Sequence, residues 1–139
     1  MILVDTNVVV AALVRQHVHH EASAAYLASI DRPQTLFAAH SLAEAYSSLT
    51  RHGGHAPFRM TGDDAWQALS SIEAHVTVIS LTPAQHVDAV RRFSDIGIGP
   101  RLYDYLIGRA GEIHGAETIV TWNAGHFRAL FPHLAVRTP

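Results

Sequence analysis

The sequence predicts an α/β fold in which a parallel sheet is covered by helices on both faces. Short apolar runs recur along the chain and are separated by longer stretches with helical spacing. Such runs suit strands buried on both faces of a sheet, and their alternation with helices favours parallel pairing. The predicted strands are Ile2–Val4, Thr35–Ala38, Val76–Ile79, Thr118–Thr121 and Leu134–Val136.

Helix start and stop signals lie between these strands. Thr61 and Thr82 are suitable N-caps, the second is followed by Pro83, and Gly115 is a suitable C-terminal cap. The Gly- and Pro-containing segment 52–57 predicts a loop. We expect helices at about residues 8–14, 21–30, 41–51, 61–72, 82–93 and 101–114, with a short helix through Leu130.

Three of these helices carry patterns that predict their packing. Gly108 and Gly111 lie on one face of the helix at 101–114, where small residues let a neighbour approach closely. The other two helices have apolar stripes that we expect to be buried. These stripes are Trp66, Leu69 and Ile72 at 61–72, and Val87, Val90 and Phe93 at 82–93.

The composition is that of one folded domain, residues 1–139. Hydrophobic residues make up 48% of the 139 positions and charged residues 16%, which argues against a disordered chain. No apolar run could span a bilayer and no basic region precedes Ile2, so we expect a cytoplasmic protein without a membrane partner. Cysteine is absent, which excludes disulfides, thiolate metal sites and cysteine nucleophiles.

The basic residues give no clear sign of a nucleic-acid surface. The formal net charge is −2, and every basic residue other than histidine is arginine. Arginine suits bidentate contacts with phosphate, although a biased genome composition explains its exclusive use equally well. The candidates for local RNA contacts are Arg15, Arg51, Arg59 and Arg101.

Histidines are frequent, and His17-Val18-His19-His20 is a dense group among them. The group lacks an acid at clear ligand spacing, and no His-Glu-x-x-His pattern occurs. We therefore expect these side chains to face solvent at the start of a helix.

Polar residues follow the first and fourth predicted strands. Asp5 comes directly after Ile2–Val4, and Asn123 lies just beyond Thr118–Thr121. Ligands of open α/β sheets bind at the carboxyl ends of the strands, which would place both residues beside a crevice. Simpler roles are also open, because Asp caps helices and Asn is common in turns.

Two further acids lie where helices are expected to begin on the same edge. Glu44 has capping-box spacing from Ser41, and in that role its carboxylate would bind the backbone at the helix start. Asp104 lies in the first turn of its helix, where an acid also favours the helix dipole. The functional alternative is that both point into the crevice beside Asp5.

Together these four residues predict a metal-dependent hydrolase. Three carboxylates that converge without Lys or Arg would repel one another unless a hard cation such as Mg²⁺ or Mn²⁺ compensates them. Such a site activates water and stabilises charge on a phosphoryl oxygen, which suits phosphodiester hydrolysis. We expect Asp5 and Asp104 as direct ligands, Glu44 at a second ion or the water, and Asn123 as a neutral oxygen donor or hydrogen-bonding group.

The chain resembles PIN-domain ribonucleases, specifically the VapC toxins of VapBC toxin–antitoxin pairs. The resemblance spans essentially the whole length and rests on four segments: Ile2–Asn7, Ser41–Glu44, Tyr103-Asp104, and Val120–Asn123 with His126-Phe127. It implies a PIN-like three-layer α/β/α fold with a roughly five-stranded parallel sheet. It also implies Mg²⁺- or Mn²⁺-dependent cleavage of structured RNA such as tRNA or rRNA, a homodimer, and a cognate VapB-type antitoxin. Thr6, Asn7 and Thr121 match polar residues that support the acids.

Asn123 departs from the pattern, because many members of this family have Asp there. We therefore expect one tightly bound ion, and a second only with substrate. An alternative is a catalytically weak PIN-like module that binds RNA or a partner. A haloacid dehalogenase-like phosphohydrolase would need an acid two residues after Asp5, where this chain has Asn7. His126 occupies a position where some relatives have an acid, and we expect it to be packed or in solvent.

Overall fold

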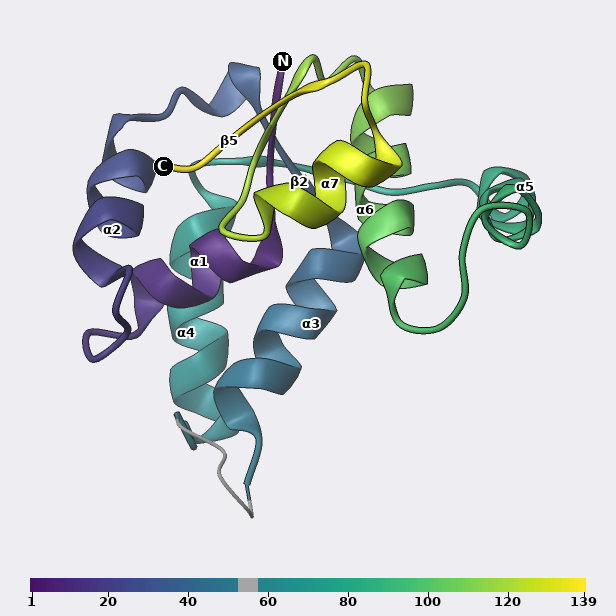
Figure 1. Cartoon of the computed structure of the whole chain (residues 1–139). Coiled ribbons are helices and arrows are strands. Elements are labelled where there is room, and N and C mark those ends of the chain that lie inside the picture. Colours follow the sequence, from purple (N-terminus) through teal and green to yellow (C-terminus); the bar gives the residue numbers. More distant parts are fainter. Residues whose placement is uncertain (53–57) are drawn as a thin grey trace.

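A computed structural model describes residues 1–52 and 58–139 and shows a parallel sheet between two layers of helices (Figure 1). The loop expected at 52–57 lies outside the described residues except for His52. The strands are β1 (Ile2–Val4), β2 (Thr35–Ala38), β3 (Thr77–Ile79), β4 (Thr118–Val120) and β5 (Ala135–Arg137). The predicted three-layer α/β/α fold is confirmed, with each strand within one residue of its expected ends.

The sheet order is β3-β2-β1-β4-β5, and every neighbouring pair is parallel. The chain therefore builds outward from β1 in one direction through β2 and β3, then returns to the other side of β1 with β4. Such a reversal of strand order opens a crevice at the carboxyl ends of the two strands involved. In this sheet those ends are the ones that follow β1 and β4.

Helices connect the strands and cover both faces. Their bounds are α1 (Thr6–Leu13), α2 (His20–Ser29), α3 (Ala39–Thr50), α4 (Gly62–Glu73), α5 (Pro83–Phe93), α6 (Arg101–Ile113) and α7 (Ala124–Leu130), with a 3-10 turn η1 (Arg32–Gln34). None of the helices in the described ranges is long and apolar enough to cross a membrane.

Two separate cores account for the continuous apolar strands. Successive strand residues point to opposite faces, so Leu3 packs in the core with α5, α6 and α7 while Val4 packs in the core with α1 to α4. Leu36 and Phe37 divide in the same way, as do Ile119 and Val120. Both faces are thus buried, as the absence of polar alternation in the strands indicated.

The expected close approach at α6 is confirmed. A Cβ atom at Gly108 would lie 2.2 Å from the ring of Phe131, and one at Gly111 would lie 2.7 Å from Leu3. These contacts seat α6 against β1 and the end of α7, and so fix the position of its first turn. The expected caps are also present: Thr61 accepts a hydrogen bond from the backbone of Asp64, and Thr82 forms a capping box with Gln85.

Part of each expected apolar stripe is exposed instead. In α4, Leu69 and Ile72 are buried but Trp66 is 55% exposed. In α5, Phe93 is buried with Ala89, whereas Val87 is 70% exposed and Val90 is also exposed. The reason is that α5 lies beyond the sheet and packs on α6 through one side only (Figure 1).

A candidate active site where β1 and β4 end

Asp5 lies at the reversal point and is 4% exposed. Asp5 directly follows β1 and is the N-cap of α1. It therefore both caps a helix and lies at the crevice. Its Oδ1 accepts a 2.7 Å hydrogen bond from the backbone N–H of Thr6, and its Oδ2 accepts one of 2.6 Å from the hydroxyl of Thr121. The carboxylate is thus fixed by residues that follow β1 and β4.

The protonation of Asp5 reflects its surroundings. Burial raises its pKa to about 7, because a charged carboxylate is poorly solvated there. The nearby carboxylates of Asp104 and Glu44 act in the same direction, while the hydrogen bonds from Thr121 and Thr6 oppose the rise. An uncompensated acid of this kind is the environment that a bound cation would relieve.

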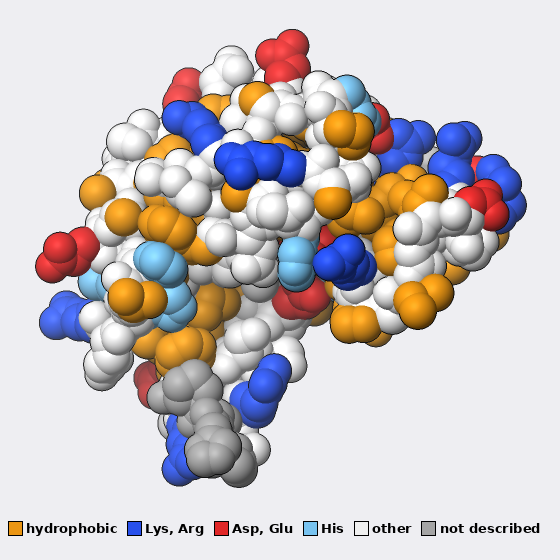
Figure 2. All heavy atoms as spheres, in the orientation of Figure 1, with side chains coloured by type: hydrophobic (Ala, Val, Ile, Leu, Met, Phe, Trp, Pro, Cys, Tyr) orange, Lys and Arg blue, Asp and Glu red, His pale blue; other side chains and the backbone are white. Residues whose placement is uncertain are grey.

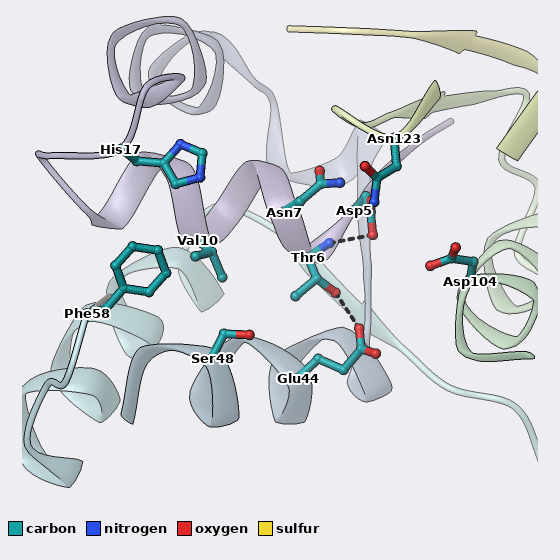
Figure 3. A pocket seen from close by; sticks show the side chains of 10 residues that line it. All are labelled: Asp5, Thr6, Asn7, Val10, His17, Glu44, Ser48, Phe58, Asp104 and Asn123. Carbon is teal, nitrogen blue, oxygen red and sulfur yellow. Dashed lines mark hydrogen bonds between the residues drawn. The ribbon is translucent and has the colours of Figure 1, made fainter. Parts of the chain in front are cut away.

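Glu44 points towards Asp5 (Figure 3), and the alternative that it forms a capping box with Ser41 is wrong. Helix α3 begins at Ala39, directly after β2, so the fully buried Ser41 lies inside the first turn and Glu44 one turn later than a capping acid would. Glu44 Oε2 accepts a 2.9 Å hydrogen bond from the hydroxyl of Thr6, and its Oε1 lies 3.6 Å from Nε2 of His40. Thr6 therefore contacts both acids, one through its backbone and one through its side chain.

Asp104 lies in the first turn of α6, as expected. Its Oδ2 lies 3.1 Å from Nδ1 of His126, which comes from α7. His126 is therefore neither packed nor simply in solvent, although its side chain is 47% exposed. This contact links the third acid to the segment that follows β4.

The segment after β4 forms a network around Asp5. The hydroxyl of Thr121 accepts hydrogen bonds from the backbone of Asn123 at 2.9 Å and from Nδ2 of Asn7 at 3.1 Å. Oδ1 of Asn7 in turn accepts a 3.1 Å bond from the backbone of Trp122. Asn123 is the N-cap residue of α7 but makes no side-chain cap bond.

These side chains line one open hollow with a volume of about 220 Å³ (Figure 3). In Figure 2, acidic and histidine side chains meet near the middle of the face, over the junction of α3, α6 and α7, with a basic side chain beside them. No lining residue among those described is Lys or Arg. The lining residues are Asp5, Thr6, Asn7, Val10, His17, Glu44, Ser48, Phe58, Asp104 and Asn123.

The hollow brings together the four residues of the expected constellation, but it is not a closed metal cage. Within 1–52 and 58–139, no three His, Asp or Glu side chains are gathered closely enough to hold an ion as they stand. The donor set nevertheless suits a hard cation, because all its charged members are carboxylates. Mg²⁺ commonly uses one or two carboxylates and keeps several waters, so it does not need a three-acid cage.

One of the four candidate arginines lies beside this site. Arg51 lines a second hollow that shares Thr6, Glu44 and Ser48 with the first. Arg15, Arg59 and Arg101 are exposed and line neither hollow. The sequence alone could not show which of the four arginines lies near the site, because the position of Arg51 depends on the path of α3 past the hollow.

The expectation for the histidine group is wrong in part. The group does stand at the start of α2, but His17, His19 and His20 are all partly buried. His17 lines the hollow, and Nδ1 of His20 lies 3.1 Å from the carbonyl of Ala11. Of the lining residues that we did not expect, Ser48 had a usable signal, because it lies four residues after Glu44 on one helix face.

Comparison with known proteins identifies the family. The PIN domain family matches residues 2–130, and "Ribonuclease VapC27" of Mycobacterium tuberculosis (strain ATCC 25618 / H37Rv) is 33% identical over 114 residues, which is 82% of this chain and 79% of the relative. The chain belongs to the PIN-domain family of VapC ribonucleases. The expected family membership is therefore confirmed.

Solved structures show the same VapC fold. Mycobacterium tuberculosis VapC20, described as a sarcin–ricin loop cleaving toxin, matches with a TM-score of 0.69 at 20% identity, covering 93% of this chain and 95% of that one. VapBC2 from Rickettsia felis, bound to a DNA fragment from its promoter, matches with a TM-score of 0.66 at 18% identity, covering 99% and 98%.

Proposed function

We propose that this VapC-family domain is the toxin of a toxin–antitoxin pair and an endoribonuclease that hydrolyses phosphodiester bonds in structured RNA, with tRNA and rRNA as the expected targets. The observation that carries the proposal is the convergence of Asp5, Glu44 and Asp104 on one hollow whose described lining contains no Lys or Arg. The named activities of VapC27 and VapC20 support the choice of RNA as substrate.

Mg²⁺ or Mn²⁺ is the proposed cofactor, with Asp5 and Asp104 as its ligands. Glu44 would serve a second ion or orient the attacking water, and Asn123 would contribute a neutral oxygen or a hydrogen bond. When bound, such an ion supplies Lewis-acid stabilisation of phosphoryl charge and a more acidic water. Because Asn123 is neutral, we expect one tightly held ion and a second only with RNA.

The protein's own part is to orient these acids. Thr121 and the backbone of Thr6 each bind one oxygen of Asp5, which leaves the remaining lone pairs of the carboxylate to face the hollow. The hydroxyl of Thr6 holds Glu44, and His126 holds Asp104. Such supporting bonds are typical of metal sites and affect both metal affinity and activity.

Cleavage of RNA by purified protein tests the proposal. We expect cleavage with Mg²⁺ or Mn²⁺, none with EDTA, and a loss of at least 100-fold in Asp5→Asn and Asp104→Asn. Asp63→Asn, which changes an exposed acid in the first turn of α4, is the matched control and should cleave normally. Undiminished cleavage by a folded Asp5→Asn protein would contradict the proposal.

Two protein partners are proposed as well. A cognate VapB-type antitoxin is expected, since VapBC2 was solved with this fold as a toxin–antitoxin pair on promoter DNA. A homodimer is expected through the exposed apolar residues of α5 and the loop that follows it, called here the α5 apolar surface: Val87, Val90, Ile96 and Ile98. In Figure 2, hydrophobic side chains gather over the loop that follows α5 and beside the helix, while charged side chains cover its outer side. Exposed apolar clusters of this kind mark interfaces.

A second candidate function is RNA binding with little catalysis. It is favoured by the neutral Asn123 and by the lack of a ready three-acid cluster in the described part of the chain. This reading predicts RNA affinity that does not depend on Mg²⁺ and a growth phenotype that survives Asp5→Asn. Binding curves with and without Mg²⁺ separate the two functions.

A further inference from the structure

The hollow has a second end that the proposed chemistry does not use. Away from Asp104 and Asn123 it is lined by Val10, His17, Ser48 and Phe58 (Figure 3). The rings of His17 and Phe58 are neighbours, with centroids 6.2 Å apart and planes tilted by 40°. One continuous hollow therefore has an acidic end and an aromatic end.

His17 is held firmly at this aromatic end. Its Nδ1 accepts a 3.1 Å hydrogen bond from the backbone N–H of His19. The ring of His19 stacks on Trp122 with centroids 3.7 Å apart and planes within 8°. The indole N–H of Trp122 donates a 2.9 Å bond to the hydroxyl of Ser23, which is fully buried. The loop between α1 and α2 is thus fixed to the segment that carries Asn123.

This hydrogen bond makes the His17 ring neutral. A nitrogen that accepts an N–H bond carries no proton, so in neutral imidazole the proton is on Nε2. Burial lowers the pKa of His17, and the neighbouring His19 and His20 lower it further. A neutral, flat ring beside a phenyl ring attracts flat heterocycles by stacking and offers no charge to a phosphate.

We propose that the aromatic end is a nucleobase subsite, in which His17 and Phe58 contact a base of the RNA while its phosphodiester lies at the acids. This inference rests on the proposed ribonuclease function. The Nε2–H of His17 and the hydroxyl of Ser48 are the polar groups at this end that a base edge can meet. Because only unpaired bases can leave their helix and stack on protein side chains, the subsite would select nucleotides in loops, bulges or single strands.

Binding of short RNAs with and without bases tests this subsite. The probes are fluorescein-labelled hexaribonucleotides of each base and a fully abasic hexamer, measured by anisotropy with Mg²⁺ and the cleavage-blocked Asp104→Asn protein. We expect base-bearing RNA to bind about tenfold more tightly than the abasic hexamer. The difference should shrink to about twofold when His17→Ala or Phe58→Ala is added.

Matched variants separate the subsite from folding effects. Val18→Ala changes an 87% exposed residue of the same loop and should keep the full difference. Phe58→Tyr retains an aromatic ring and should also keep the difference in affinity. Phe58→Leu retains most of the apolar volume but not the ring, and should lose the difference. The subsite is overturned if base-bearing and abasic RNA bind equally, or if the difference survives both alanine variants. RNA cleavage by the wild-type protein is measured separately. Failure of the proposed ribonuclease function and failure of the nucleobase subsite therefore give different results.

Discussion

Thr121 donates a 2.6 Å hydrogen bond to Asp5 although the two residues are 116 positions apart in the chain. The bond joins the end of β4 to the end of β1, the two strands at which the order of the sheet reverses. It fixes Oδ2 of the buried Asp5 carboxylate, whose other oxygen is bound by the backbone of Thr6. The geometry of the site therefore depends on this pair.

Replacement of Thr121 by valine should weaken catalysis and stability together. Thr121→Val keeps the shape of the side chain but removes the donor to Asp5 and the acceptor for Asn7 and Asn123. A hydrogen bond to a charged group contributes about 1.5–3 kcal/mol, so we expect kcat/KM for RNA to fall by about tenfold or more. Steady-state cleavage and thermal melting measure the two effects.

Two variants check that this effect comes from the hydroxyl. Thr121→Ser retains the donor and should recover most of the activity. Thr118→Val alters the first residue of the same strand, away from the site, and should remain close to wild type. Equal activity of Thr121→Val and Thr118→Val would show that the bond has no role in catalysis.

The raised pKa of Asp5 predicts how stability changes with pH in metal-free protein. The folded protein holds the Asp5 proton up to a pH of about 7, whereas the unfolded chain releases it near 3.8. Between these values the folded state binds more protons, so the free energy of unfolding falls as pH rises. The expected fall is on the order of a few kcal/mol, and urea denaturation in EDTA measures it.

The Asp5→Asn variant isolates this contribution. It cannot titrate, so its free energy of unfolding should be flatter than that of wild type between pH 4 and about 7. The lowered pKa of His17 acts in the opposite direction but is present in both proteins. Parallel pH profiles for wild type and Asp5→Asn would contradict a raised pKa at Asp5.

Divalent cations should stabilise the folded protein if the acids hold them. Binding to the folded state alone at 100 times the Kd adds about 2.7 kcal/mol. We expect Mn²⁺ to raise Tm above pH 7, where Asp5 is ionised, and to do so less at pH 5, where protons compete. Differential scanning fluorimetry measures the shift.

The acids themselves provide the control for this experiment. Asp5→Asn and Asp104→Asn should remove most of the Mn²⁺-dependent shift, while Asp63→Asn should retain it. A shift of the same size in all four proteins would locate the cation elsewhere and leave the proposed ligands without support.

The fold was predictable because its strands carry an unmixed apolar signal. Thr35–Ala38 is buried throughout and is bounded by a 3-10 turn and a helix, so its ends matched the expectation. The start of α3 was missed because Ala38 has no side-chain cap, whereas Ser41 and Glu44 imitate one three residues later. Local spacing cannot distinguish a capping acid from one that points across the sheet edge.

The members of the site that were missed depend on the paths of loops. Asp5 directly follows β1 and Asn123 lies a few residues beyond β4, so the predicted strand ends located both. His17 lies in the loop that the stack of His19 on Trp122 holds against the segment after β4, a contact between residues far apart in sequence. The exposure of Val87 likewise depends on α5 having a neighbour on one side only, which helical spacing does not reveal.

The α5 apolar surface should govern self-association. Ile98 is 90% exposed in the loop after α5, and burying it with Val87 against a second copy would remove both from water. We expect a dimer for wild type in size-exclusion chromatography with light scattering. Ile98→Asp combined with Val87→Asp should shift the protein to a monomer, because two buried unpaired charges oppose association.

Val18→Asp is the matched control for this shift. Val18 is as exposed as Ile98 but lies in the loop between α1 and α2, so a charge there should leave the dimer intact. Both variants place Asp at exposed positions and should keep the Tm near that of wild type. A monomeric wild type, or a dimer that survives the double substitution, would show that two copies do not pair through α5.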